Sequence, residues 1–494
     1  MSADLLLAID QGTTGTTVLA MDTDGRTLAR HTEEFPQHYP QPGWVEHDLA
    51  DIDKSVHRAL GKVLESVEAK RIAAIGITNQ RETTVLWDRK TGEPVHRAIV
   101  WQDRRTSDRT AELRAQGKEP LVKARTGLVL DPYFSGTKVA WMLDAVSGAR
   151  DRATRGELAF GTIDAFLVHR LTSGARHATD VTNASRTLLM DLEKCAWDDE
   201  MLDLFRVPRG VLPDIVSSAE RIAETRGFDG LPDGIPITGI AGDQQAALFG
   251  QACFGVGDSK CTYGTGAFAL TNVGSAPCAS KAGLLSTVAW RVGGATTYAL
   301  EGSAFIAGAA VQWLRDGLGI VKSASEIEAL ARKVDSSEGV VFVPALSGLG
   351  APYWDPHARG LISGITRGTT GAHIARATLE GIAFSVADLL RAMASDLGRD
   401  IGRLRVDGGA AANDLLMQFQ ADVSGAAIER PRELESTARG AAMLAGVGVG
   451  LFASAAESAK MSKVDRTFTR VMADDAVRDH RARWDSAIRR AMVH

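Results

Sequence analysis

Three short segments of the chain combine glycine with hydroxyl or carboxylate side chains directly after apolar runs. They read DQGTTGTT at residues 10–17, TYGTG at 262–266 and RVDGGAAAN at 405–413. Glycine lets the backbone turn its N–H groups toward an anion, threonine hydroxyls add donors, and Asp10 can hold Mg²⁺ directly or through water. The pattern indicates phosphate chemistry, but a hairpin turn capped by Asp10 accounts for the first segment equally well. A Walker P-loop is excluded, because neither Gly61-Lys62 nor Gly117-Lys118 precedes Ser or Thr.

A fourth segment places a carboxylate where a buried strand is expected to end. The run 237–241 is apolar, Gly242 and Asp243 follow, and residues 245–249 favour a helix. By its spacing alone, Asp243 is an aspartate after a strand and one of many possible turn caps.

The segments that precede and follow these motifs predict strands that alternate with helices. Residues 5–9 and 17–21 predict a hairpin, and residues 259–270 predict a second one with the same architecture. Further strands are expected at 72–78, 340–343 and 404–406, with helices at 48–68 and 370–397, the latter ended by Gly398. This order predicts an α/β fold. A chain of 494 residues exceeds one ordinary core, so we expect domains at 1–250 and 251–494 with the active site in a cleft between them.

Composition excludes several classes of protein. The net charge is −5 and the chain has no long basic block, which argues against nucleic-acid binding. The apolar run at the N-terminus is interrupted by Asp10, and no stretch approaches a membrane span, so we expect neither a signal peptide nor a membrane helix. The four cysteines lack C-x-x-C spacing, which indicates reduced thiols in a cytoplasmic protein.

Taken in order, the three glycine-rich segments resemble the phosphate-1, phosphate-2 and adenosine motifs of the actin, Hsp70 and sugar-kinase superfamily. NQRETT (79–84), IVWQDRRT (99–106), DPYFSGTK (131–138), GIAGDQQAALFG (239–250) and GLGAPYWDP (348–356) resemble the FGGY carbohydrate kinases, and among them the members that act on glycerol. The resemblance extends from about Leu5 to Gly450. It implies two duplicated actin-like ATPase (ribonuclease H-like) domains, and we expect a homo-oligomer, either a dimer or a tetramer.

The resemblance also implies a reaction, the ATP-dependent phosphorylation of glycerol to glycerol 3-phosphate by in-line transfer. Asp243 would act as general base, and Mg²⁺ would bridge the phosphates near Asp10 and Asp243. The positions that match the family's polyol site are Arg81, Glu82, Tyr133, Asp243 and Gln244. Trp101 and Phe268 are expected to cover the carbon backbone of the polyol, although ordinary core aromatics are an equally good interpretation.

The nucleotide contacts follow from the same resemblance. The phosphates are expected at Thr13, Thr14 and Gly15, with Thr265 from the second hairpin. The positions that match the rest of the ATP site are Gly308, Gln312, Gly409 and Asn413. Asn413 alone is at least as well explained as a helix N-cap.

The chain departs from the family pattern at three places. Gly15 and Thr17 stand where the family commonly has serine and arginine, so a charged nucleotide contact is missing at Thr17. The stretch 227–231 (GFDGL) replaces a Gly-Gly-Lys-Gly-Gly loop, which argues against inhibition by fructose 1,6-bisphosphate. The stretch TFTRVMADD near the C-terminus differs from the segment that binds a sugar-transport regulatory protein in enteric relatives, so that partner is not expected.

Three other functions remain as alternatives. A kinase for a pentulose or erythritol would alter NQRE and DPYFSG, which both stand intact. A chaperone-like or filament-forming ATPase of the same superfold has no use for Arg81, Glu82 and Tyr133. A sugar sensor without turnover is disfavoured by the presence of Asp10 and Asp243.

Overall fold

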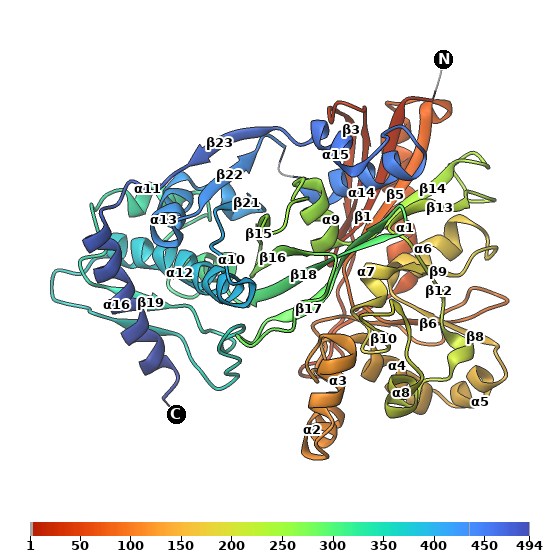
Figure 1. The fold of residues 1–494 in the computed structure, drawn as a ribbon, viewed down its shortest axis with the longest axis horizontal. Coiled ribbons are helices and arrows are strands. Elements are labelled where there is room, and N and C mark those ends of the chain that lie inside the picture. The colour runs from red at the N-terminus through yellow and green to blue at the C-terminus, as the bar shows by residue number, and fades with distance from the viewer. Residues whose placement is uncertain (1–2, 434, 494) are drawn as a thin grey trace.

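The computed structural model describes residues 3–433 and 435–493. Its centre is a sheet of thirteen strands in the order β23-β22-β21-β15-β16-β18-β17-β13-β14-β5-β1-β2-β3, which runs through both halves of the molecule (Figure 1). The two halves of the sheet meet at β13 (Ala219–Glu224) and β17 (Leu285–Val292), which pair only through Ala219 and Val292. The sheet is thus nearly divided into two smaller sheets.

The first of these sheets follows a 3-2-1-4-5 order. Strands β1, β2 and β3 are successive antiparallel neighbours, and β5 and β14 then add in parallel beside β1. Their bounds are β1 Leu5–Gln11, β2 Gly15–Met21, β3 Thr27–Glu34, β5 Ile72–Asn79 and β14 Pro236–Gly242. Helix α1 (Leu49–Leu64) covers β2 and β3, and Asp48 caps it by accepting a hydrogen bond from the N–H of Ala50.

The second sheet repeats this order and these directions. Strands β15, β16 and β18 are antiparallel, and β21 and β22 add in parallel beside β15. Their bounds are β15 Ser259–Tyr263, β16 Ala267–Gly274, β18 Ala295–Ala304, β21 Arg403–Asp407 and β22 Ala427–Pro431. The repeat confirms the predicted duplicated α/β fold. Since the two hairpin tips share little sequence, the duplication is one of architecture.

Two helices connect the halves. Helix α9 (Asp243–Gly250) follows β14 of the first sheet. Helix α14 (Ser436–Gly448) follows β22 of the second sheet but packs on β14, β5, β1 and α9 of the first half. The crossing of α9 and α14 depends on glycine, because a Cβ on Gly440 would lie 1.8 Å from the carbonyl oxygen of Ala246. Helix α14 belongs to the second half by sequence but packs on the first sheet. The predicted domain boundary at residue 250 therefore stays a prediction.

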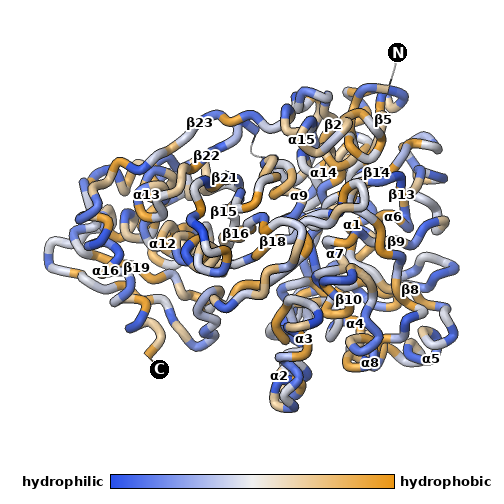
Figure 2. Tube along the Cα trace, in the orientation of Figure 1, coloured by the Kyte–Doolittle hydropathy of each residue, from blue (hydrophilic) through white to orange (hydrophobic). Residues whose placement is uncertain are grey.

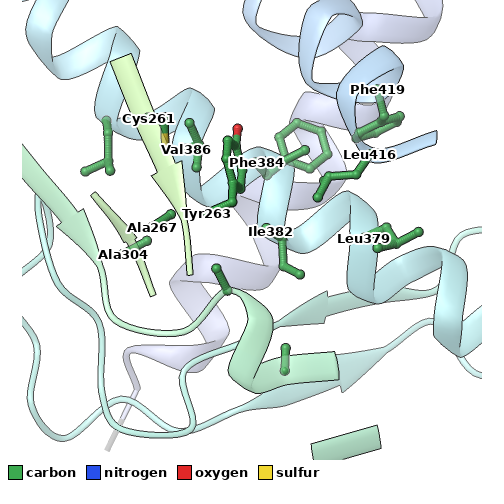
Figure 3. Close-up of a cluster of buried hydrophobic side chains, with 14 of the residues drawn as sticks. Cys261, Tyr263, Ala267, Ala304, Leu379, Ile382, Phe384, Val386, Leu416 and Phe419 are labelled. Atoms are coloured by element: carbon green, nitrogen blue, oxygen red, sulfur yellow. The ribbon is translucent and has the colours of Figure 1, made fainter. Parts of the chain in front are cut away.

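The core of the second half shows how the long helix α12 (Gly371–Leu397) is held. Figure 3 shows Cys261 and Tyr263 of β15 together with Ile382, Phe384 and Val386 of α12, and all five are buried. Helix α13 (Asp414–Ser424) closes the same cluster. As predicted, α12 ends at Gly398, which has φ +66°.

A long insertion between β5 and β14 forms most of the lower right of Figure 1. Its helices and strands are β6 Val85–Asp88, β7 Ala98–Ile99, α2 Ser107–Ala115, α3 Glu119–Thr126, α4 Ser135–Ala145, α5 Ala149–Thr154, β8 Leu158–Gly161, α6 Ile163–Leu171, β9 Ala178–Asp180, α7 Val181–Ala184, β10 Met190–Asp191, β11 Ala196–Trp197, α8 Asp199–Phe205, η2 Arg209–Val211 and β12 Asp214–Val216. Helix α2 projects outward with many hydrophilic residues (Figure 2), which suits its exposed position.

The remaining elements lie outside the two strand sets and the insertion. They are β4 Glu46–His47, η1 Ala69–Arg71, α10 Gly308–Asp316, α11 Glu326–Ala331, β19 Val341–Val343, β20 Leu361–Ser363, η3 Gly409–Ala412, α15 Ala455–Ser458, η4 Ala459–Met461, β23 Val464–Phe468 and α16 Asp474–Ala491. Within residues 3–433 and 435–493, none of the helices has the length and apolar character needed to span a bilayer.

Candidate active site

Asp243 begins helix α9 where β14 ends. Strands β5 and β14 are parallel and pair Asn79 with Gly242, so the residues that follow each strand meet at one edge of the sheet. Arg81, two residues beyond β5, therefore lies beside Asp243, with its Nε 3.2 Å from Oδ1 of the carboxylate. Oδ1 also accepts a hydrogen bond from the backbone N–H of Gln244 at 2.7 Å. Both contacts use Oδ1 of a side chain that is 30% exposed.

Three buried charged side chains surround Arg81. Its Nη1 and Nη2 donate to the two oxygens of Glu301, at 2.5 and 2.9 Å. Arg186 donates from Nη2 to Glu301 at 3.0 Å and from Nε to Glu82 at 2.7 Å. Glu301 lies on β18 of the second half, so the cluster joins both halves of the molecule. The sequence predicted that Arg81 and Glu82 share a site, and the structure brings them together with Arg186 and Glu301.

The cluster contains balanced charge. Burial raises the pKa of a carboxylate, but for Glu301 the charges of Arg186 and Arg81 outweigh it and lower the pKa to about 2. Burial would likewise lower the pKa of Arg81, yet Glu301 and Glu82 raise it well above its ordinary value. Two arginines and two glutamates therefore compensate one another in a dry environment, where an unpaired charge would cost several kcal/mol.

Glu82 has a backbone conformation that a non-glycine residue seldom adopts. Its φ is +58°, in the left-handed region. Ser135 Oγ and Lys138 Nζ donate to its carbonyl oxygen at 3.0 and 3.3 Å, and Thr84 Oγ1 donates to the same oxygen at 3.0 Å. Lys138 also donates to the carbonyl of Tyr133 at 2.5 Å. The SGTK end of DPYFSGTK thus fixes the strained residue, and burial lowers the pKa of Lys138 to about 7.

Three aromatic rings adjoin these charges. Trp101 stands edge-on to Tyr133 and Phe268, with ring centroids 5.7 and 6.4 Å apart. The hydroxyl of Tyr133 accepts from Arg81 Nη2 at 3.4 Å. Trp101 Nε1 donates to Thr13 Oγ1 at 2.9 Å, which joins the aromatic group to the first glycine-rich tip. The aromatics named from the sequence therefore lie together, and their contact with a polyol stays a prediction.

Gln244 is held from the second half by a buried lysine. Lys260 Nζ, on β15, donates to Gln244 Oε1 and, at 2.9 Å, to Thr262 Oγ1. Burial lowers the pKa of Lys260, and the negative charge of Asp407 offsets part of this effect. Asp407, at the end of β21, also accepts from Ser436 Oγ of α14. Lys260 thus orients a residue of the predicted polyol site.

The first glycine-rich tip places Asp10 opposite Thr17. The two residues are cross-strand partners in β1 and β2, and a backbone hydrogen bond from Gly12 to Gly15 closes the turn that carries Thr13 and Thr14. Burial raises the pKa of Asp10 well above its ordinary value, and the negative charges of Asp243 and Glu435 add to the rise. A cation bound near these carboxylates would favour their charged forms.

The second tip and the segment after β21 lie side by side. The N–H groups of Ala307 and Gly308 donate to Thr265 and Gly264, which seats the start of α10 against the tip, and Gln312 is exposed one turn further along α10. Gly408 has φ +84° and a Cβ there would lie 2.5 Å from the carbonyl oxygen of Tyr263.

Asn413 caps α13, because its Oδ1 accepts a hydrogen bond from the N–H of Leu416 at 2.9 Å. The interpretation of Asn413 as a helix N-cap is thus confirmed for its side-chain oxygen. Gly409 is exposed and faces open space. Nucleotide contacts at Gly409 and Asn413 stay predictions.

Sequence reasoning missed Arg186, Glu301, Lys138 and Lys260. A signal existed for Glu301 alone, because a glutamate interrupts the apolar strand around Tyr298–Gly302. Such a residue needs a partner of opposite charge, but the partners lie 220 and 115 positions away in the chain.

Comparison with known proteins decides the family. The model of the N-terminal domain of the FGGY family of carbohydrate kinases matches residues 5–250, and the model of its C-terminal domain matches residues 259–449. The chain belongs to this family. As an FGGY kinase it is similar over its full length to the glycerol kinase of Myxococcus xanthus, with 58% identity over 493 residues and 99% of both chains covered. The glycerol kinase of Alkalilimnicola ehrlichii is 54% identical and covers 98% of both chains.

Solved structures agree with this assignment. The glycerol kinase of Plasmodium falciparum with ADP has a TM-score of 0.94 at 37% identity, covering 100% of this chain and 99% of that one. A gluconate kinase from Lactobacillus acidophilus has a TM-score of 0.89 at 22% identity, which shows the shared fold. The predicted family and fold are confirmed, and the kinase is a phosphotransferase. The cytoplasmic location and the homo-oligomer stay predictions.

Proposed function

We propose that this FGGY kinase transfers the γ-phosphoryl group of ATP to glycerol, giving glycerol 3-phosphate, with Asp243 as general base. The observation that carries the proposal is the convergence of Glu82, Tyr133 and Asp243 on Arg81. Glycerol has three hydroxyls and little apolar surface, so a selective site needs charged donors and acceptors in fixed positions. The full-length relatives named glycerol kinase support the same substrate.

Asp243 suits the role of base by its geometry. Its Oδ1 faces Arg81 Nε and the N–H of Gln244, which leaves Oδ2 to accept the proton of the attacking hydroxyl. A base needs to lie within hydrogen-bond reach of that proton, and Arg81 orients both the carboxylate and the hydroxyl. The proton moves to Asp243 as the substrate oxygen attacks the γ-phosphorus in line with the leaving ADP oxygen.

The polyol would lie between the charged cluster and the aromatic rings. Arg81 and Glu82 would bind hydroxyls, with Tyr133 and Gln244 beside them, and Trp101 and Phe268 would cover the carbon backbone. This division follows from the chemistry of each side chain, since a ring edge or face excludes water from C–H groups while charged groups satisfy O–H groups.

The phosphates would lie between the two tips, with N–H groups and hydroxyls from Thr13, Thr14, Gly15 and Thr265 as donors. Gly308, Gln312, Gly409 and Asn413 would contact the rest of ATP. The carboxylate oxygens of Asp10 and Asp243 are of the kind that Mg²⁺ prefers. A cation bound there would lower the pKa of Asp10, which burial and neighbouring negative charges raise. Within the described residues no group of three or more His, Cys, Asp and Glu side chains gathers for a metal. Phosphate oxygens and water would therefore supply most ligands of the Mg²⁺, which neutralises charge on the transferring group.

The test is a coupled ADP-release assay of the wild type and of Asp243→Asn with glycerol, dihydroxyacetone, erythritol and xylulose. We expect glycerol to give the highest kcat/KM, and D243N to lower kcat by about 10²- to 10⁴-fold, the contribution of a general base. Glycerol should still bind to D243N. Near-normal turnover of that variant would remove Asp243 from the role of base, and a preference for xylulose or erythritol would overturn the substrate.

A further inference from the structure

Glu301 has no role in the reaction proposed above. It is buried in the middle of β18, in the half of the molecule opposite to Arg81, Glu82 and Asp243. Its two oxygens bind Arg81 Nη2 and Nη1, and Oε1 also accepts from Arg186 Nη2. A carboxylate with three charge-assisted hydrogen bonds fixes the planes of both guanidinium groups.

This fixed orientation decides which side of Arg81 faces the site. Because Glu301 occupies both terminal nitrogens, Arg81 presents Nε to Asp243, at 3.2 Å. That nitrogen is buried and has no hydrogen bond within the described residues, since its contact with Asp243 lacks hydrogen-bond geometry. Arg81 therefore approaches Asp243 with one N–H group and not with its fork. A forked ion pair would occupy both oxygens of the base.

Glu301 is also connected to Glu82, through Arg186. Arg186 connects the two glutamates, with its Nη2 on Glu301 and its Nε on Glu82 at 2.7 Å. Arg186 is fully buried, and its remaining nitrogen Nη1 is without a hydrogen bond among the residues that the structure describes. Glu82 is thereby held from its carboxylate by Arg186 and from its carbonyl by Ser135 and Lys138.

We propose that Glu301 is a positioning residue of the polyol site, which holds Arg81 by its terminal nitrogens and Glu82 through Arg186. The proposal rests on the proposed function, because it names what orients the side chains assigned there to the polyol and the base. It also makes the polyol site dependent on the second half of the chain, since β18 must pack against the first half for Arg81 to have its partner.

The consequence of losing the charge of Glu301 follows from the distances. In Glu301→Gln the side chain keeps its shape but loses its charge and one acceptor, so Arg81 is drawn to its other anionic neighbours, Asp243 and Glu82. The guanidinium then competes with the substrate hydroxyl for Asp243. Nucleotide contacts on the two glycine-rich tips are not part of the cluster, so the KM for ATP should not change.

The experiment compares E301Q with Glu380→Gln by steady-state kinetics, varying glycerol and ATP separately. Glu380 is a matched control, because it is also buried, accepts from Arg376 Nε at 3.0 Å and lies on α12 away from the site. We expect E301Q to lower kcat/KM for glycerol by about 10- to 100-fold, as for a misplacement of about 1 Å, and to leave the KM for ATP within about twofold. E380Q should lower thermal stability and leave both KM values within about twofold.

Two charge-conserving variants keep the test decisive if E301Q does not fold. Glu301→Asp retains the charge at a shorter reach, and Arg186→Lys retains a cation without the fork, so both should raise the KM for glycerol selectively. The proposal is overturned if folded E301Q, E301D or R186K keeps the wild-type KM and kcat for glycerol, or if the KM for ATP rises equally. Failure of the proposed function would look different, because the wild type itself would then not phosphorylate glycerol.

Discussion

The crossing of α9 and α14 should respond sharply to a single methyl group, since Gly440 of α14 lies directly against the backbone of α9. In Gly440→Ala the new Cβ would meet the Ala246 carbonyl oxygen at 1.8 Å, its carbon at 2.6 Å and Gly250 N at 3.0 Å. All three atoms belong to backbone, so no side chain can rotate away. An ordinary contact begins near 3.4 Å, so the helices must separate by about 1.6 Å.

This separation has a functional consequence, because α9 begins with Asp243 and Gln244. Overpacking of this kind costs about 1–3 kcal/mol of unfolding free energy. A displacement of about 1 Å at a reacting group can cost about 100-fold in rate. We therefore expect G440A to lose both stability, measured by urea denaturation, and about 100-fold in kcat, measured by ADP release with saturating glycerol and ATP.

Gly61→Ala is the matched control for this prediction. Gly61 lies within α1, and a Cβ there would have no atom within 4 Å. The same substitution should raise the unfolding free energy by about 0.5–1 kcal/mol, because alanine loses less backbone entropy in a helix, and should leave kcat unchanged. If G440A matches the wild type in both stability and kcat, the argument from the close approach is refuted.

Two further predictions concern single residues. Burial lowers the pKa of Lys138 from 10.5 to about 7 in the folded chain, so the unfolded chain binds more protons between these values. We therefore expect the difference in unfolding free energy between the wild type and Lys138→Met to stay constant below about pH 7. Above that pH the difference should rise in favour of the wild type, by at most about 1.4 kcal/mol per pH unit. Urea titrations at pH 6, 8 and 9.5 measure it, and a difference that does not change with pH would contradict the lowered pKa. Thr17→Arg, beside Asp10, should lower the KM for ATP about fivefold by adding a cation near the phosphates, whereas Thr32→Arg, one strand further out, should not; equal effects of the two variants would exclude a local contact.

Patterns within short stretches of sequence predicted the main strands and helices of this fold. Apolar runs predicted both hairpins and the strand that ends just before Asp243, and α12 ends at Gly398 as its sequence predicted. These features depend on residues within one or two turns of each other, where periodicity, capping and glycine conformation act. Arg81 and Asp243 also lie side by side, because the parallel strands β5 and β14 bring their carboxyl ends to the same edge.

By itself, the sequence determined the strand ends that carry Asp10 and Asp243, the glycine-rich tips and the family resemblance, all of which are written in contiguous residues. Only the tertiary structure decided that α14 packs on the first sheet, that Lys260 holds Gln244, and that Glu301 and Arg186 neutralise Arg81 and Glu82. The reason is physical. A buried charge is tolerated only beside its partner, and the partner of Arg81 stands 220 residues away, where no local pattern records the pairing.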